Sequence, residues 1–461
     1  MYILDKEATK PLYIQFYDAM KEEILNSLSL GAKLPSVRKV AMEYTISKNT
    51  VELAYKQLYA EGYIESIPKS GYFVADTFRE YGTLTLTTPL NISETKPQIR
   101  YDFFPARLTH DAFPLKLWQR LFIKAMKESL DFGAYGDIQG EQGLRAEIAQ
   151  YLITSRGVNC DAAQIVVCGG FTDSMNRLAA LFKEHFQRIA IEHPGYPATG
   201  KVFEDYGYDL VPIEVDHNGL NIDQLEATKA KLVYITPSHQ YPTGVTMPIH
   251  NRMKLLDWAK RIQGVIIEDD YDSELRYQNR PIPSLQGLDH DESVIYVGTF
   301  SKSLSPALRV SYIVLPHRYL NAYTKVCQMR HQRCPVSLCI QKTLELFMKG
   351  GHWERHLRKI RTLNRKKHDL MKERLKSTLG PMIEIISEGG GLAILIRPTL
   401  TIDLQTLKAN ALKQGIKLYC ASDLYGETWE AIRMGFGGLS EREIEEAIEL
   451  LQTIWLKTLE A

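Results

Sequence analysis

Lys302 stands in the segment "TFSKSLSPALR" (299–309), which is rich in hydroxyl groups and directly follows the apolar run "SVIYVG" (293–298). A lysine amine can condense with an aldehyde to form a Schiff base when its surroundings favour the neutral amine. A lysine in a turn is otherwise simply solvated. The role of Lys302 therefore depends on which other side chains the fold brings beside it.

Polar and glycine residues follow several other short apolar runs in the same way, and helical stretches such as 249–261 separate these runs. This alternation predicts an α/β fold with a largely parallel sheet and helices on both faces. Ligands bind such sheets at the carboxyl ends of the strands. We therefore expect one pocket to contain the residues that follow the runs: Gly169, Gly170, Phe171, Thr172, Tyr196, His239, Gln240, Tyr241, Asp269, Tyr271, Thr299, Ser301 and Lys302.

These residue types suit an aromatic, phosphorylated aldehyde that has a basic ring nitrogen. A glycine turn that opens a helix binds phosphate. A lysine forms the Schiff base, and a carboxylate such as Asp269 keeps a pyridine nitrogen protonated, so that the ring accepts electrons. A phenol such as Tyr271 can hydrogen-bond the ring hydroxyl. Each motif alone is common in loops, but their joint occurrence at successive strand ends predicts pyridoxal 5'-phosphate (PLP) as the cofactor.

Residues 10–77 predict a separate winged helix-turn-helix domain. Three amphipathic helical stretches, 11–28, 34–44 and 47–62, precede two short alternating strands at 63–74. In that fold the third helix enters the major groove and the second crosses the DNA backbone. The expected DNA-binding residues are Ser36 and Arg38 at the phosphates, Lys48, Asn49 and Thr50 in the groove, and Lys69 and Ser70 at the wing tip.

Composition and charge narrow the class of protein. The 461 residues carry a net charge of +1, and residues 1–78 hold nine Lys and Arg against ten Asp and Glu, so solvated polar caps are the alternative explanation of the DNA-binding pattern. No long apolar run or signal-peptide pattern occurs, which predicts a cytoplasmic location without a membrane partner. Six scattered cysteines, and His352 and His356 without a third ligand, argue against a disulfide framework and a metal site.

Several segments resemble known families. "LPSVRKVA" (34–41) and "SKNTVELAYKQL" (47–58) resemble the winged helix of the GntR family, with Lys48 where that family often has arginine. "TPSHQYPTG" (236–244), "EDDYDSELRY" (268–277) and "IRMGFGG" (432–438) resemble the MocR/GabR regulators, which join a GntR-type winged helix to a fold-type I aminotransferase-like domain. The resemblance covers essentially the whole chain.

The resemblance implies a winged helix at 1–77, a linker at 78–99 and a PLP-binding domain at 100–461. A smaller C-terminal α/β subdomain is expected from about residue 317. The linker is rich in Thr, Ser and Pro, although "TLTLTT" (83–88) also has the alternation of an edge strand.

The family's residue roles fall on matching positions of this chain. Lys302 would carry the cofactor, with Asp269 at the pyridine nitrogen, Tyr271 at the ring oxygen and Tyr196 stacked on the ring. Arg433 would bind the carboxylate of an effector. The residues expected around the phosphate are Gly170, Phe171, Thr172, Thr299, Ser301 and Arg309, with Tyr135 from a partner subunit.

Two positions depart from the family pattern. Tyr241 replaces the asparagine that touches the ring oxygen in aminotransferases, a role that Gln240 or His239 would have to fill. Ala198 stands where the GABA-responsive member has an arginine, which favours a different effector.

Three functions follow from the resemblance and stay open at this stage. The favoured one is a homodimeric, head-to-tail transcription regulator that binds operator DNA and responds to PLP itself or to an amino compound joined to PLP. The others are an active aminotransferase with an appended DNA-binding domain, and a sensor of PLP without amine chemistry. The sequence names neither the effector nor the operator.

Overall fold

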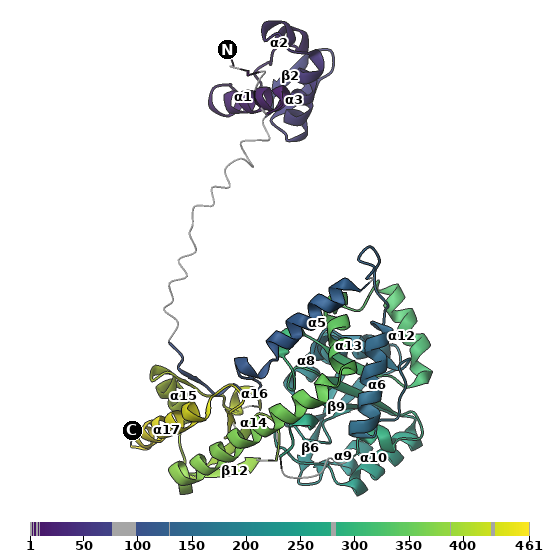
Figure 1. Ribbon diagram of the computed structural model, residues 1–461, viewed down its shortest axis with the longest axis vertical. Helices are drawn as coiled ribbons and strands as arrows, with labels where there is room; N and C mark the ends of the chain where they lie inside the picture. The colour runs from purple at the N-terminus through teal and green to yellow at the C-terminus, as the bar shows by residue number, and fades with distance from the viewer. Residues whose placement is uncertain are drawn as a thin grey trace. The chain divides into compact units, whose positions relative to one another are not determined.

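The computed structural model describes residues 2, 4–5, 8, 10–75, 98–128, 130–277, 283–387, 389–425 and 429–460. The chain forms two compact units, Met1–Thr95 and Lys96–Ala461, and Figure 1 shows both. Of the predicted linker at 78–99 only residues 98 and 99 are described, so that prediction and the alternative strand at 83–88 lie outside the described residues.

The first unit is a winged helix-turn-helix, as the sequence predicts. Apolar side chains from all three helices form its core, including the fully buried Phe16, Val51 and Leu58. The elements are α1 (Leu12–Asn26), α2 (Val37–Glu43), α3 (Lys48–Ala60) and an antiparallel hairpin of β1 (Ile64–Ile67) and β2 (Gly71–Val74).

Serine side chains begin two of these helices. Ser36 Oγ accepts the N–H of Lys39 at 3.3 Å, and Ser47 Oγ accepts the N–H of Thr50 at 3.0 Å. Such caps satisfy N–H groups that have no partner inside the helix. Gly62 follows α3 with a φ of +79°, a conformation that ends helices and favours glycine. α2 and α3 therefore start at Val37 and Lys48, within the helical stretches 34–44 and 47–62 that the sequence predicts.

The second unit is built around an eight-stranded sheet with the order β4-β11-β10-β9-β8-β5-β6-β7. β5 pairs in parallel with β6 and β8, and β9 pairs in parallel with β8 and β10. β11 is antiparallel to both of its neighbours, and β7 is antiparallel to β6. The prediction of a mainly parallel sheet is confirmed. The strands are β4 (Ile165–Cys168), β5 (Arg188–His193), β6 (Asp209–Asp216), β7 (Gly219–Leu220), β8 (Leu232–Ile235), β9 (Val265–Asp270), β10 (Val294–Thr299) and β11 (Ser311–Val314).

Helices cover both faces of this sheet, because its central strands are apolar on both sides. On one face, Leu178 and Phe203 pack against alternate residues of β8, β9 and β10. On the other face, Leu255 and Trp258 pack against the intervening residues. The helices of this part are α5 (Leu115–Lys127), α6 (Gln142–Arg156), α7 (Phe171–Phe182), α8 (Pro197–Asp205), α9 (Ile222–Ala227), α10 (Ile249–Ile262), α11 (Leu285–Leu288), α12 (His317–Met329) and α13 (Leu338–Lys349).

A smaller α/β part contains three antiparallel strands in the order β12-β13-β15. The parallel pairing of β3 with β14 joins the start of the unit to this part. α12 contacts α7, and α13 contacts α5 and α6; the start of the smaller part at about residue 317 stays a prediction. Its elements are β3 (Tyr101–Asp102), α14 (His352–Arg374), β12 (Ile383–Ser387), β13 (Ala393–Pro398), α15 (Leu404–Lys413), β14 (Ile416–Lys417), α16 (Ser422–Tyr425), β15 (Ile432–Gly435) and α17 (Glu441–Leu459).

None of the helices in the described part of the chain has the length and apolar character that crossing a bilayer requires.

Candidate functional site

A cavity of about 1040 Å³ lies at the carboxyl ends of the parallel strands. Such an edge is where α/β sheets bind ligands, because the loops that follow neighbouring strands meet there. The cavity brings together most of the site residues that the sequence predicts: Phe171, Thr172, Tyr196, Tyr241, Asp269, Tyr271, Thr299, Ser301, Lys302, Arg309 and Arg433.

The carboxylate of the cavity comes from the end of β9. Successive side chains of a strand point to opposite faces, so Asp269 faces away from Glu268 and Asp270. Tyr234 of β8 donates its O–H to Asp269 Oδ2 at 2.6 Å. Burial raises the pKa of Asp269 to about 8. A cationic ring nitrogen beside Asp269 would oppose this effect and stabilise the ionised carboxylate.

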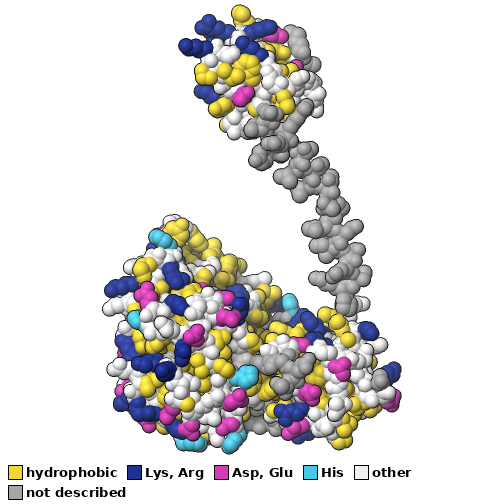
Figure 2. Space-filling model, turned by 180° about the vertical axis from the view of Figure 1, so that it is seen from behind, with side chains coloured by type: hydrophobic (Ala, Val, Ile, Leu, Met, Phe, Trp, Pro, Cys, Tyr) yellow, Lys and Arg dark blue, Asp and Glu magenta, His cyan; other side chains and the backbone are white. Residues whose placement is uncertain are grey.

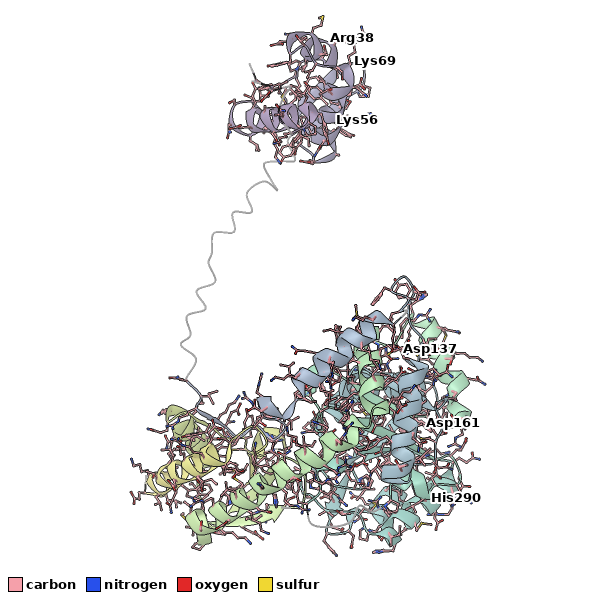
Figure 3. All side chains as sticks on the ribbon, viewed as in Figure 1. Arg38, Lys56, Lys69, Asp137, Asp161 and His290 are labelled. Carbon is pink, nitrogen blue, oxygen red and sulfur yellow. The ribbon has the colours of Figure 1, made fainter. Side chains whose placement is uncertain are left out.

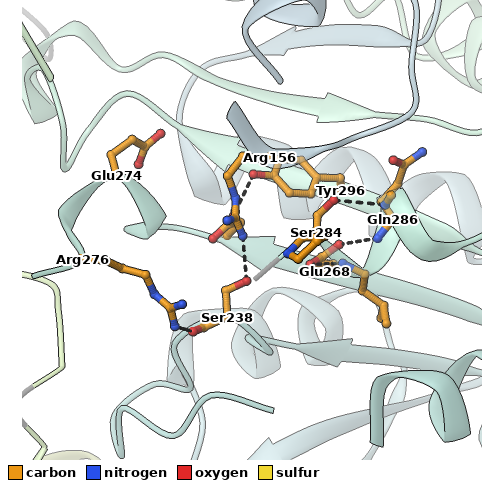
Figure 4. A network of polar contacts seen from close by, with 12 residues as sticks. Arg156, Ser238, Glu268, Glu274, Arg276, Ser284, Gln286 and Tyr296 are labelled. Atoms are coloured by element: carbon orange, nitrogen blue, oxygen red, sulfur yellow. Dashed lines mark hydrogen bonds and ion pairs between the residues drawn. The ribbon is translucent and has the colours of Figure 1, made fainter. Parts of the chain in front are cut away.

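The other two carboxylates of β9 hold the strand in place, and Figure 4 shows Glu268 with its partner Gln286. Arg156 Nε lies 2.7 Å from Asp270 Oδ2, and the same oxygen accepts the O–H of Tyr296 at 2.6 Å. Glu268 accepts two backbone N–H groups, both at 2.8 Å, from the start of α11. Buried carboxylates need such partners. The acidic run therefore fixes the position of Asp269.

Lys302 lies in the turn that follows β10, half-buried in the cavity wall. Its Nζ makes no hydrogen bond or ion pair with the residues that the structure describes. Burial, with a further contribution from the guanidinium of Arg433, lowers the pKa of Lys302 to about 8. The neutral, nucleophilic amine is therefore far more populated near neutral pH than in an ordinary lysine, at about a tenth of the side chain at pH 7.

The start of α7 forms a cradle for an anion. Gly170 precedes the helix with a φ of +95°, and a Cβ built on it would lie 2.2 Å from the guanidinium of Arg309. This backbone conformation requires glycine. Thr299 donates its hydroxyl to Ser301 Oγ at 3.0 Å on the cavity wall. Free N–H groups at a helix start, a guanidinium and two hydroxyls fit a phosphate group.

Aromatic rings line one side of the cavity at right angles to one another. The ring of Tyr196 lies 5.2 Å from that of Phe171 and 5.3 Å from that of Tyr241. Tyr241 in turn lies 6.1 Å from Tyr271. Tyr196 is 39% exposed, so one face of its ring is available to stack on a planar ligand.

Arg433 reaches the cavity from β15 of the smaller part. It donates a hydrogen bond to the hydroxyl of Tyr241, while its Nε is buried without a hydrogen-bond partner in the described part of the chain. Leaving a buried charged donor unsatisfied is costly. A ligand carboxylate beside this guanidinium would supply the missing acceptor.

The first unit presents polar side chains in the positions that the sequence predicts for DNA contacts. Arg38 on α2, and Lys48 and Asn49 in the first turn of α3, are exposed. Lys69 and Ser70 lie in the turn between β1 and β2. Figure 2 shows Lys and Arg side chains gathered on one side of this unit.

Two other predicted residues of this unit, Ser36 and Thr50, also have structural roles, and one residue that was not predicted, Lys56, lies nearby. The side chain of Ser36 caps α2, and the hydroxyl of Thr50 lies 2.8 Å from Ser47 Oγ, so both residues also have structural roles. Figure 3 labels Lys56 near the same edge of the unit as Arg38 and Lys69. Lys56 is exposed on α3 eight residues after Lys48. This spacing places both lysines toward one face of the helix and could have identified Lys56 as a further candidate for DNA contact.

Comparison with known proteins assigns a family to each of the two units. Residues 110–451 match the family described as Aminotransferase class I and II, and residues 12–74 match the Bacterial regulatory proteins, gntR family. The probable rhizopine catabolism regulatory protein MocR of Rhizobium meliloti is 30% identical over 475 residues, which cover 99% of this chain and 96% of MocR. The chain is a MocR-type transcription regulator.

Other relatives agree with this assignment. The HTH-type transcriptional regulators YdeL and YhdI of Bacillus subtilis are 39% and 38% identical, and each match covers 98% of this chain. Among solved structures, the multiple substrate aminotransferase of Thermococcus profundus has a TM-score of 0.70 and 23% identity, and the match covers 80% of this chain and 93% of the aminotransferase. The second unit of this MocR-type regulator therefore has the fold-type I aminotransferase fold.

Two predicted site residues lie elsewhere in the regulator. Gln240 is buried outside the large cavity, where its Nε2 donates to the carbonyl oxygens of Pro194 and Tyr241 and its Oε1 accepts the hydroxyl of Thr243. The amide of Gln240 is therefore already hydrogen-bonded within the protein, and its role in place of the asparagine of aminotransferases stays a prediction. Tyr135 is 90% exposed and does not line the cavity of its own chain, so its place in a partner's site stays a prediction.

Some residues in and behind the cavity wall were not predicted. Tyr234, the partner of Asp269, is the one side chain with a polar group in the strand "LVYI", and that position was a usable signal. Side chains from segments distant in sequence have no local pattern that marks them. Those that line the remaining wall include Phe104, Phe113, Trp118, Leu308 and Leu424.

Proposed function

We propose that this regulator binds PLP covalently at Lys302 and changes its binding to operator DNA in response to PLP itself or to an amino compound that reacts at the same site. The observation that carries the proposal is the meeting of Lys302, Asp269, Tyr271 and Arg309 in one cavity. Two comparisons support it. A relative is named the pyridoxine biosynthesis transcriptional regulator PdxR, and a solved neighbour, LysN of Thermus thermophilus, is complexed with N-(5'-phosphopyridoxyl)-L-leucine.

Bound PLP supplies an aldehyde that reacts with amines and a ring that accepts electrons. Different residues of this chain would bind different parts of the cofactor. Lys302 supplies the amine, Asp269 holds a proton at the ring nitrogen, and Tyr271 hydrogen-bonds the ring oxygen. Arg309 and the start of α7 hold the phosphate, and Tyr196 covers one face of the ring.

The remaining part of the cavity favours an amino acid with one carboxylate and an apolar side chain. Arg433 offers one guanidinium with an unpaired Nε. The wall beyond the cofactor residues is formed mainly by apolar and aromatic side chains, among them Phe104, Phe113 and Trp118. Ala198, which also lines the cavity, offers no charge to a second carboxylate or amine.

The first unit would recognise the operator. We assign the groove to Lys48, Asn49 and Thr50, the phosphates to Ser36 and Arg38, and the wing contact to Lys69 and Ser70. A head-to-tail homodimer would present two such units to paired half-sites, with Tyr135 of each subunit entering the other's PLP site.

An active aminotransferase is the second candidate function, because the cavity contains the groups that both functions need. Sustained conversion of an amino acid into its keto acid would favour that candidate. One conversion per bound cofactor, without turnover, agrees with regulation.

The test of the proposed function is a titration of the full-length protein with PLP, monitored by absorbance. The wild-type protein and Lys325→Ala, which changes an exposed lysine of α12, should both develop the visible absorbance of lysine-bound PLP. Lys302→Ala should lack this absorbance and keep its circular dichroism. The same visible band in Lys302→Ala would contradict the assignment.

A further inference from the structure

A histidine and an aspartate lie directly behind Tyr271. Nδ1 of His239 is 2.8 Å from Asp272 Oδ2 and 3.3 Å from the hydroxyl oxygen of Tyr271. The side chains of His239 and Asp272 are only 13% and 5% exposed. The rings of His239 and Tyr271 stack with an angle of 24° between their planes. Three polar side chains are therefore held in one fixed arrangement beside the cavity.

The chemistry of these groups determines the direction of the hydrogen bonds. An ionised carboxylate only accepts hydrogen bonds, so His239 must carry its proton on Nδ1, where it faces Asp272. A protonated Nδ1 has no lone pair and cannot accept the hydroxyl proton of Tyr271. The tyrosine oxygen can only accept the weaker branch of the Nδ1–H bond. Its own O–H is therefore free to point into the cavity.

We propose that Asp272 and His239 are positioning residues that keep the Tyr271 hydroxyl as a donor toward the ring oxygen of PLP. The inference rests on the proposed function, since it assigns a direction to a contact with the cofactor. The proposal also accounts for Tyr241, which stands in place of the asparagine of aminotransferases. The amide of Gln240 is hydrogen-bonded to other protein groups, whereas His239 reaches Tyr271.

Other charged groups lie near His239, Asp272 and Tyr271 and also affect the charge at this site. Lys302 and Arg433 line the same small cavity of about 50 Å³ as His239, and Arg276 also feels the charge of Asp272. Nε2 of His239 is buried without a hydrogen-bond partner among the described residues. Because Asp272 also acts on Lys302 through its charge, removing that charge has a second effect that must be separated from the first.

The two effects of Asp272→Asn have opposite signs. An asparagine can donate to Nδ1, which lets His239 shift its proton to Nε2 and accept the hydroxyl of Tyr271. The ring oxygen of PLP would then lose a donor, and its anionic form would be less stable. The pH at which the bound cofactor changes absorbance should rise by about one unit, the size of one lost hydrogen bond. Loss of a negative charge alone would instead lower that pH.

The experiment is a pH titration of the visible absorbance in full-length, PLP-loaded protein. Asp272→Asn, His239→Gln and Tyr271→Phe should each raise the midpoint by about one unit. Tyr271→Phe combined with Asp272→Asn should show no further rise beyond Tyr271→Phe. Asp161→Asn, which removes the carboxylate from an exposed pair with His317 and is labelled in Figure 3, should leave the midpoint unchanged.

Each other outcome has a definite meaning. A midpoint that falls or stays constant in both Asp272→Asn and His239→Gln, with PLP still bound, would overturn the inference and leave the proposed function standing. The same Asp272→Asn rise with Phe at position 271 would show that Asp272 does not act through the Tyr271 hydroxyl, which also overturns it. Absence of the band in wild-type protein would overturn the proposed function itself.

Discussion

At the scale of single residues, the site depends on two groups whose proton affinities are shifted by their surroundings. Burial lowers the pKa of Lys302 to about 8 and raises that of Asp269 to about 8. An ordinary lysine is almost fully protonated below about pH 9, so this shift makes more of the neutral amine available near neutral pH. Titratable groups shifted in this way and facing a cavity are typical of functional sites.

This predicts a pH dependence for the capture of PLP. The rate should rise as pH increases through about 8, because the neutral amine of Lys302 is the reacting form. Arg433→Gln should move the midpoint to higher pH, because the guanidinium repels the ammonium form. Stopped-flow absorbance measures both rates, with the exposed Arg397→Gln as control. A midpoint near 10.5, the value of an unperturbed lysine, would contradict the account.

At the scale of elements, α3 must be held in place to present Lys48 and Asn49. Its first turn depends on the Ser47 side chain, which accepts the N–H of Thr50 at 3.0 Å. Ser47→Ala should destabilise the first unit by about 1 kcal/mol. Hydrogen exchange of the full-length protein should show faster exchange in α3, with no change in the sheet of the second unit.

The control is Ser29→Ala, which changes an exposed serine outside the helices. Unchanged exchange in α3 of Ser47→Ala would show that the cap contributes nothing measurable to this helix.

The same scale explains what the sequence could and could not predict. Runs such as 232–235 and 265–267 are buried on both faces, so they are apolar throughout and predict strands in a parallel sheet. Their ends then predict which side chains meet. Local sequence does not record that β11 inserts antiparallel between β4 and β10, or that Gln240 turns inward, because contacts between distant segments decide both. The wall around Trp118 was missed for the same reason.

At the scale of the whole molecule, a DNA-binding unit and an aminotransferase fold share one chain. In the function proposed above, the cavity around Lys302 would bind PLP, whose aldehyde reacts with amines, and the winged helix would couple that reaction to DNA binding. In a regulator, a ligand controls DNA binding only to the extent that it favours one arrangement of the molecule over another. The proposed regulation therefore requires that binding of PLP or an amino compound at Lys302 changes the affinity of the protein for DNA.

The most direct test compares DNA affinity with the state of the PLP site. Operator sequences selected from random DNA by the wild-type protein would be titrated at fixed salt, since affinity for DNA depends steeply on ionic strength. The titration uses protein without PLP, with PLP, and with PLP plus an apolar amino acid. The account predicts that at least one ligand changes the affinity of the wild-type protein by fivefold or more, roughly 1 kcal/mol of coupling, and that Lys302→Ala loses this change. An equal change in Lys302→Ala, or no change in the wild-type protein, would contradict it.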